Sequence, residues 1–178
     1  MFGCIIDASA LSYGINISAA DVSVFGFEIK GDDSTTSGVT IAEGSSNVVI
    51  DGNQIHGMKL PNSNNSPASY GVLVWGYDVH DIFIQNNEIY DINLFGISIS
   101  EMVVNVTISN NNIHDLEYLV AAPNDLTSIL LGLDLGLEYD AEWWGSMLEG
   151  SGLSMEDNYS ISVGIFAALV DGITVSGN

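Results

Sequence analysis

A short strand pattern recurs along the chain and restricts its fold more than any other feature. Each copy begins with an aromatic or small residue, which is followed by glycine and then by a strand with alternating apolar residues. The copies cover residues 13–18, 37–42, 70–75, 95–100 and 163–168. Their glycines at 14, 38, 71, 96 and 164 give a basic period of about 24 residues with two insertions. Copies that keep the same strand order favour units stacked in one direction.

Two further short strands follow the first strand in most copies. The second strands cover residues 22–24, 48–50, 82–84, 106–108 and 173–175, and the third strands cover 27–30, 53–56, 87–90 and 111–114. Three strands in so short a period leave no room for the helix of a βαβ unit. The sequence therefore predicts an all-β parallel β-helix of about five coils with three short strands each. We expect residues 1–178 to form a single domain that is a segment of a longer protein.

Strand alternation predicts which side chains face the interior of the coil. Apolar residues of all three strands would form continuous ladders between successive coils. Asn53, Asn87 and Asn111 recur at one corner, with Asn178 as their next member. We expect these amides to form a buried ladder, because they can bond to one another and to the turn backbone. Cys4, in an apolar stretch, is predicted to be a buried thiol.

The segments 47–56, 81–90 and 105–114 resemble the coil repeat of right-handed β-helix proteins of the pectate-lyase-like superfamily. The resemblance covers most of residues 13–118 and 163–178, and it implies a right-handed helix. That superfamily contains lyases, epimerases, hydrolases, phage spikes, adhesins and surface-layer proteins. The resemblance therefore implies a fold but no single activity.

Charge restricts the partners of the chain. It carries 23 Asp and Glu against 2 Lys and Arg, for a formal net charge of −21. Nucleic-acid binding needs clustered basic residues, so that class is excluded. No apolar run is long enough for a membrane span, so no direct insertion into a membrane is expected. Repulsion among so many acidic side chains is tolerated in high salt, with bound divalent cations or over a long surface. We therefore expect an extracellular or cell-surface protein, although no signal peptide is visible.

The largest insertion, residues 118–162, is acidic and carries a helical pattern. Its apolar residues between 126 and 137 have helical spacing after a cap at Asn124 or Asp125, which predicts a partly helical flap between coils. Carboxylate oxygens suit calcium, so calcium is the candidate cofactor, although no EF-hand spacing is present and no cofactor is certain from the sequence. The candidate metal ligands are Asp134, Glu138, Asp140 and Glu142.

Two segments resemble catalytic motifs of polysaccharide-acting enzymes. Residues 75–80 are similar to the segment of mannuronan epimerases in which a tyrosine and a histidine act as acid and base, although here Trp75 replaces the tyrosine and Val79 a proline. The candidate catalytic residues are Tyr77, Asp78 and His80, with Lys59 as the cation. Asp32 and Asp33, with His56, resemble polygalacturonase motifs that supply paired carboxylates, but the Arg-Ile-Lys counterpart is absent.

The outward positions leave two functions open. Those of the first strands carry no ionisable side chain, which favours a structural or carbohydrate-contacting module over an enzyme. Trp75, Tyr70, Tyr77 and Phe95 are candidates for a sugar-stacking platform. The outward residues of the third strands could bind a divalent cation or a sugar, or be solvated; they are Glu28, Lys30, Gln54, His56, Glu88, Tyr90, Asn112 and His114.

The expected partners are a polysaccharide or further copies of the chain. Uncapped coils at both ends would allow copies to stack end to end and extend into a filament. The alternative function is a polysaccharide-acting enzyme, namely a uronan epimerase, a lyase or a glycoside hydrolase.

Overall fold

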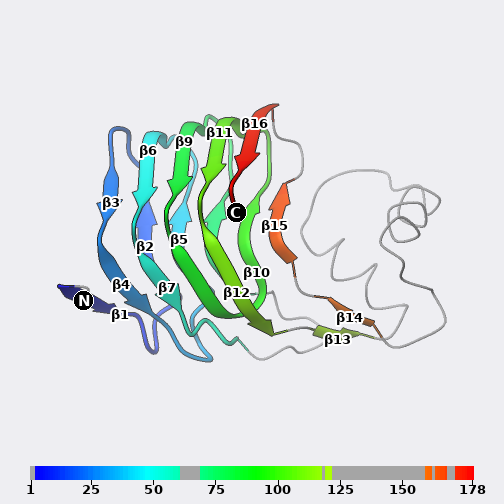
Figure 1. Ribbon diagram of the computed structural model, residues 1–178. Helices are drawn as coiled ribbons and strands as arrows, with labels where there is room; N and C mark the ends of the chain where they lie inside the picture. The colour runs from blue at the N-terminus through cyan, green and yellow to red at the C-terminus, as the bar shows by residue number, and fades with distance from the viewer. Residues whose placement is uncertain (1–2, 61–68, 118, 122–158, 162, 168–170) are drawn as a thin grey trace.

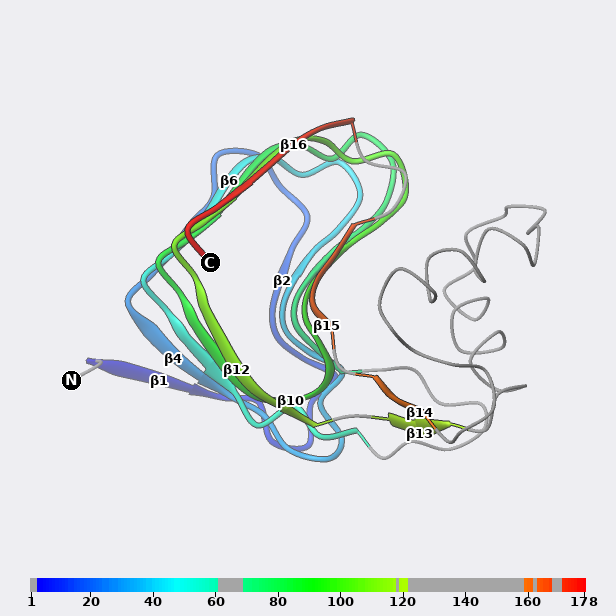
Figure 2. The ribbon, with the colours of Figure 1, turned by 45° about the vertical axis from the view of Figure 1, so that its right-hand side comes forward.

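The computed structural model describes residues 3–60, 69–117, 119–121, 159–161, 163–167 and 171–178. Within them the chain winds through three parallel β-sheets that enclose a common interior (Figures 1 and 2). Apart from one antiparallel pair, every pairing between these strands is parallel, so the predicted parallel β-helix is confirmed.

We name the three sheets A, B and C. Sheet A comprises β1 (Cys4–Asp7), β4 (Phe27–Lys30), β7 (Gln54–His56), the first half of β10 (Glu88–Ile99) and β12 (Asn112–Glu117). Sheet B comprises β2 (Tyr13–Ile17), β5 (Ser37–Ile41), β8 (Ser69–Val74), the second half of β10 and β15 (Val163–Ala167). Sheet C comprises β3 (Ser23–Phe25), β6 (Ser46–Asp51), β9 (His80–Gln85), β11 (Val104–Ser109) and β16 (Asp171–Ser176).

The strands agree with the repeat in the sequence, with one difference at β10. There the predicted third strand of one coil and first strand of the next form a single strand of 12 residues, which joins sheets A and B. A left-handed backbone at Asp91 and Leu94, with φ of 57° and 89°, accompanies the change from one sheet to the next. The chain therefore turns this corner without leaving the strand.

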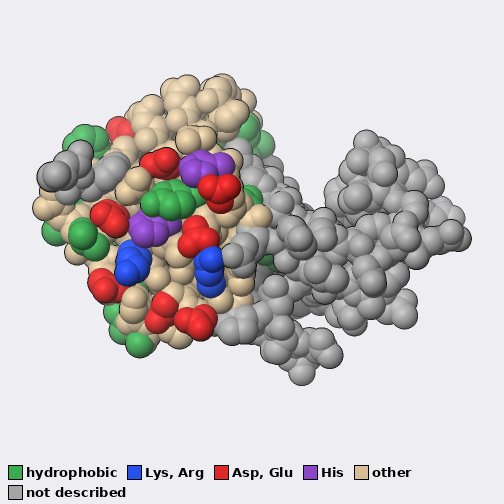
Figure 3. Space-filling model, turned by 60° about the horizontal axis from the view of Figure 1, so that its bottom comes forward, with side chains coloured by type: hydrophobic (Ala, Val, Ile, Leu, Met, Phe, Trp, Pro, Cys, Tyr) green, Lys and Arg blue, Asp and Glu red, His purple; other side chains and the backbone are tan. Residues whose placement is uncertain are grey.

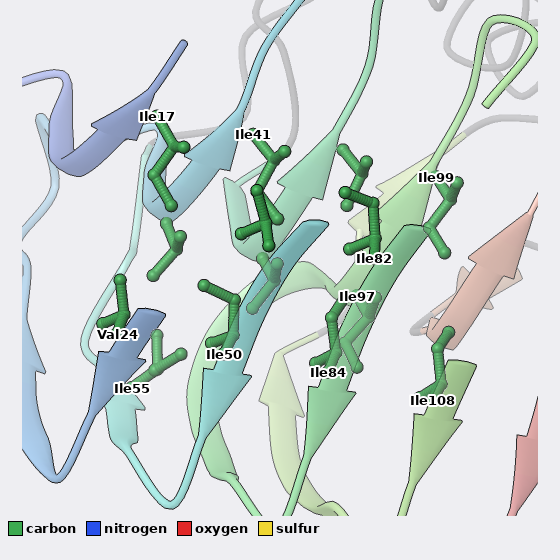
Figure 4. Close-up of a cluster of buried hydrophobic side chains, with 14 of the residues drawn as sticks. Ile17, Val24, Ile41, Ile50, Ile55, Ile82, Ile84, Ile97, Ile99 and Ile108 are labelled. Atoms are coloured by element: carbon green, nitrogen blue, oxygen red, sulfur yellow. The ribbon is translucent and has the colours of Figure 1, made fainter. Parts of the chain in front are cut away.

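The interior is filled by the aliphatic ladders that alternation predicts (Figure 4). Ile29, Ile55 and Ile89 of sheet A are fully buried and in register, and their column continues to Ile113. The same holds for the inward valines and isoleucines of sheets B and C in the middle coils. Burial of such side chains stabilises the fold by about 1.5–3 kcal/mol each, so the ladders are its main source of stability.

The repeated glycine has a steric cause at the corner between sheets A and B. A Cβ on Gly14 would lie 2.6 Å from the carbonyl oxygen of Gly38 and 2.7 Å from Cγ2 of Ile29. On Gly71 it would lie 2.6 Å from the carbonyl oxygen of Gly96. Successive coils therefore approach so closely here that no side chain fits between them.

The asparagines form a continuous ladder at the corner between sheets C and A. Oδ1 of Asn87 accepts the backbone N–H and the side-chain amide of Asn53, at 3.0 and 3.1 Å. Asn111 does the same for Asn87, and Asn178 for Asn111. The side-chain amide of Asn87 also donates to the carbonyl of Ile50 at 2.9 Å. The ladder thus satisfies backbone groups that no sheet pairs.

The corner between sheets B and C uses acidic residues for a structural purpose. Asp21, Asn47, Asp81 and Asn105 succeed one another there, all with left-handed φ between 51° and 59°. The amide of Asn47 donates to Asp21 at 2.7 Å, and that of Asn105 to Asp81 at 3.2 Å. Alternation of Asp with Asn keeps two carboxylates from stacking on adjacent coils, where like charges repel.

The predicted helices of the insertion lie outside the described residues. The described segments nearest to them in sequence are β13 (Leu119–Ala121) and β14 (Tyr159–Ile161), which form the antiparallel pair. The prediction of a buried Cys4 was wrong, because its side chain is exposed. The residue lies in β1, which pairs with β4 alone among the described strands.

Candidate functional site

The outer face of sheet A carries a dense set of polar and ring side chains, which we call the sheet A face (Figure 3). Alternation around the buried isoleucines points two columns outward. The first column contains Glu28, Gln54, Glu88 and Asn112, and the second contains Lys30, His56, Tyr90 and His114. Parallel, in-register pairing places each member beside its counterpart on the next coil, so the face is a linear array along the helix axis.

Three rings of the second column stack on one another. The rings of His56 and Tyr90 have centroids 4.8 Å apart and planes within 9° of parallel. Those of Tyr90 and His114 have centroids 5.3 Å apart and planes within 2°. Both faces of the Tyr90 ring are therefore covered by imidazoles, and the stack presents ring edges with N–H and O–H groups to solvent.

The first column links these rings to carboxylates. Oε1 of Glu28 lies 3.3 Å from Nε2 of His56, and Oε1 of Glu88 lies 3.4 Å from Nε2 of His114. The other oxygen of Glu88 accepts a 2.7 Å hydrogen bond from the amide of Gln54. One network therefore joins β4, β7, β10 and β12 across the face and fixes its groups in place.

Two groups of the sheet A face have shifted pKa values. The pKa of His114 is raised, first by its 2.9 Å hydrogen bond with Asp115 and further by Glu88, because both carboxylates stabilise the imidazolium. The pKa of Tyr90 is raised by burial, and then by the charges of Glu88, Glu28 and Asp91, which oppose formation of a phenolate. The imidazole of His114 therefore keeps a proton to higher pH, and the phenol of Tyr90 remains a hydrogen-bond donor.

Both basic residues of the chain lie at this face. Lys30 is in register with His56, and Nζ of Lys59 lies 2.6 Å from Oδ1 of Asp91, directly after Tyr90. The carboxylates of the face still outnumber them; they are Glu28, Glu88, Asp91 and Asp115. The face thus offers hydrogen-bond donors and acceptors together with charges of both signs, but it has no net positive charge.

Of the predicted epimerase-like residues, Lys59 is separated from the other three. His80 begins β9 and shares a 2.9 Å hydrogen bond with Asp81, whereas Lys59 pairs with Asp91. Strand β8 separates these groups, and a strand of its length spans roughly 17–20 Å. Lys59 therefore cannot act as the cation for Asp78 and His80, which follow the other end of β8 beside the exposed Tyr77.

The polygalacturonase-like carboxylate of Asp32 lies on the segment beside His56, but its hydrogen bonds go to turn residues. Oδ1 of Asp32 accepts hydrogen bonds from the backbone N–H and the hydroxyl of Ser34, and Oδ2 accepts the N–H of Ala10. The bonds from Ser34 are the main cause that lowers the pKa of Asp32 to about 2. Such a carboxylate holds a turn and is a poor proton donor, while His56 pairs with Glu28 instead.

Only half of the predicted sugar-stacking platform lies at the surface. Trp75 and Tyr77 are 43% and 63% exposed, but Tyr70 and Phe95 are 5% and 2% exposed. The two buried rings stack on each other with centroids 5.4 Å apart, and burial raises the pKa of Tyr70 to about 12. The prediction must therefore be corrected for Tyr70 and Phe95, since neither ring offers a face to a sugar.

The predicted metal ligands Asp134, Glu138, Asp140 and Glu142 lie outside the described residues. Within the described part of the chain, no group of three or more His, Cys, Asp and Glu side chains is placed to hold a metal ion. In the same residues no helix has the length and apolar character to cross a membrane.

Sequence alternation identified the residues of the sheet A face but not their stacking. The signal was present, because His56, Tyr90 and His114 each lie three residues after a ladder asparagine. Residues at the same offset from that ladder occupy adjacent coils about 4.8 Å apart, which suits stacked planar rings.

Comparison with known families matches residues 2–178 to the family described as the right-handed beta helix region. Comparison with curated proteins and with solved structures gives no match.

Proposed function

Because the chain belongs to the right-handed β-helix family, we propose that it is an extracellular or cell-surface structural module that contacts a polysaccharide through the sheet A face. The observation that carries this proposal is the linear array of donors and acceptors on that face. A linear glycan laid along the helix axis meets a similar set of groups at each coil.

The chemistry of the sheet A face favours a neutral, polyhydroxylated polymer over a polyuronate. Sugar hydroxyls both donate and accept, so they suit the carboxylates of Glu28 and Glu88 together with the edges of the rings. A polyanion would meet more carboxylates than lysines on the face, and the chain as a whole carries a formal charge of −21. An extracellular or cell-surface setting is consistent with this charge.

The sheet A face is also pre-organised for binding. Its imidazoles, carboxylates and amide already hydrogen-bond across four strands, and the ring of Tyr90 stacks between the two imidazoles. Fewer side chains then lose conformational freedom when a ligand binds, which favours affinity. Apolar stacking on a sugar ring has no place on the covered faces of Tyr90, so edge-on hydrogen bonding is the expected mode of contact.

Affinity electrophoresis of the purified chain in gels containing neutral glycans, polygalacturonate or alginate tests this function. We expect retardation by a neutral glycan and no retardation by the uronates in EDTA. Tyr90→Ala should reduce the retardation about tenfold, while Tyr90→Phe, which keeps the stack, should retain part of it. Phe83→Ala is the matched control, because Phe83 points outward from sheet C.

Two outcomes would contradict the proposed site. If Trp75→Ala abolishes binding and Tyr90→Ala leaves it intact, the glycan binds at the exposed aromatic residues between sheets B and C. If no tested glycan retards the chain, the polysaccharide function fails. Release of unsaturated products, new reducing ends or epimerised residues from any of these polymers would favour the alternative, a polysaccharide-acting enzyme.

A further inference from the structure

The last coil of the described helix exposes core positions that earlier coils bury. Ile173 and Val175 of β16 are 37% and 51% exposed, whereas Val106 and Ile108, their neighbours on β11, are fully buried. Asn178 continues the asparagine ladder but is exposed, unlike the buried Asn111 beneath it. Among the described residues, no further coil lies on top of these positions.

The same end of the helix presents unpaired strand edges. Among the described residues, β12 pairs only with β10, β15 only with β10, and β16 only with β11. Free N–H and C=O groups along an edge are a template for a further strand. Here one edge belongs to each of the three sheets, so the template has the outline of a whole coil. We call it the C-terminal coil surface.

The opposite end of the helix provides a matching set. Strands β1, β2 and β3 are the first members of sheets A, B and C, and within the part of the chain that the structure describes each pairs on one side only. Ile6 of β1, Ile15 of β2 and Val22, directly before β3, pack against the core but remain partly accessible. Because all the coils share one strand order and direction, this end offers β12, β15 and β16 the same kind of parallel neighbour that an internal coil offers.

We propose that the C-terminal coil surface docks on the first coil of a second copy of this chain. Strand β12 then pairs in parallel with β1 of the second copy, β15 with its β2, and β16 with its β3. The contact buries Ile173 and Val175 against the first coil of the neighbour. It is heterologous, so a second molecule still has its own C-terminal coil surface open, and copies add in a line.

Charge sets the conditions for this contact. Each copy carries a formal charge of −21, so two copies repel at low ionic strength. The Debye length falls from about 30 Å at 0.01 M salt to about 3 Å at 1 M, and the apolar contact is not weakened by this screening. Association is therefore expected to increase with salt, the opposite of what a contact made by ion pairs would show.

Sedimentation velocity of the 178-residue chain in low and high sodium chloride, over a wide range of protein concentration, tests the proposal. We expect monomers at low salt, and dimers and longer species as salt and protein concentration rise. Val175→Asp should abolish association, whereas Thr174→Asp should not. Both substitutions add the same charge to the same strand, but Thr174 is at an outward position. Circular dichroism verifies that each variant is folded.

A mixing experiment tests the head-to-tail geometry separately. Ile6→Asp alters the first coil and Val175→Asp the last, so each variant keeps one intact surface. Each alone should be monomeric at high salt, and an equimolar mixture should form dimers but nothing longer. Wild-type protein that stays monomeric at every salt and concentration would overturn the proposal. That result is expected if part of the same chain covers the C-terminal coil surface. Association of Val175→Asp equal to wild type, or a mixture that remains monomeric, would also overturn it.

Discussion

The ring of Tyr90 lies parallel to the ring of His56 at a centroid distance of 4.8 Å. This distance is about the spacing between neighbouring strands in any β-sheet. The stack therefore follows from the parallel register of β7 and β10, which places equivalent side chains directly above one another. It also decides how the sheet A face can bind a ligand, because stacked rings expose edges and not faces.

Replacement of Tyr90 tests how much this stack contributes to stability. Each aromatic pair adds about 0.5–1.5 kcal/mol beyond area burial, and Tyr90 takes part in two pairs. We expect Tyr90→Ala to lower the free energy of unfolding by about 2 kcal/mol and Tyr90→Phe by less than half as much. Urea unfolding followed by circular dichroism measures both. A loss as large for Phe83→Ala, on the outer face of sheet C, would show that the stack has no special role.

The asparagine ladder is predicted to be essential for the corner between sheets C and A. Asn87→Ala removes the acceptor of Asn53 and the donor to Ile50, and it leaves buried backbone groups unpaired. Each such group costs about 1–3 kcal/mol, so we expect a loss of about 3 kcal/mol. Asn112→Ala, at an exposed position on the next coil, is the matched control and should change the unfolding midpoint little. Equal losses in the two variants would contradict a structural role for the ladder.

Replacement of glycine at the corner between sheets A and B is predicted to destabilise the inner coils. Gly71→Ala would place a Cβ 2.6 Å from the carbonyl oxygen of Gly96, and the backbone cannot yield without shifting a coil. Overpacking of this kind costs about 1–3 kcal/mol. Gly3→Ala has open space and should be nearly neutral. Thermal unfolding of the two variants, compared with wild type, measures the difference, and equal melting temperatures would refute the steric explanation.

Protonation of His114 links the sheet A face to pH. Its pKa is raised above the ordinary 6.5, chiefly by the hydrogen bond with Asp115. A raised pKa means that the charged pair stabilises the fold fully below pH 6.5, and that this contribution is lost as the pH rises through the folded-state pKa. The effect on unfolding is expected to be small, because the side chain is 37% exposed and solvent screens the pair.

The His114 prediction is measured best by NMR titration of the imidazole. We expect its midpoint above 6.5 in wild type and nearer to 6.5 in Asp115→Asn, which removes the largest cause of the shift. A midpoint that is the same in both proteins would mean that Asp115 does not control the proton.

Calcium is predicted to stabilise the chain. After residue 59 the sequence contains sixteen acidic residues and no Lys or Arg, and an ion that binds only the folded state stabilises it by mass action. We expect a higher melting temperature in millimolar calcium than in EDTA at matched ionic strength. Replacement of Asp134, Glu138, Asp140 and Glu142 by their amides should remove the increase. Identical melting curves in calcium and EDTA would eliminate calcium as a cofactor.

Most of the fold could be predicted from the sequence because a β-helix repeats one local pattern. The strand β4 agrees with the predicted residues 27–30, and the other strands of the repeat agree to within a few residues. Alternation placed Ile29, Ile55 and Ile89 inside and Glu28, His56 and Tyr90 outside. Those assignments need only the period of two along a strand and the spacing of the repeat.

The features of the site that sequence reasoning missed depend on how corners are built. Tyr70 and Phe95 precede the recurring glycine of their coils and are expected at the surface, yet they stack on each other and are buried. Lys59 and His80 lie only 21 positions apart, but the chain between them runs along β8 and carries them to opposite corners of the coil. The sequence by itself determined the β-helix, its registers and its inner and outer faces, since these follow from local periodicity. Only the tertiary structure decided which outer side chains share a corner, which rings stack and which lie buried, because these depend on the bends between the sheets and on contacts between residues of different coils.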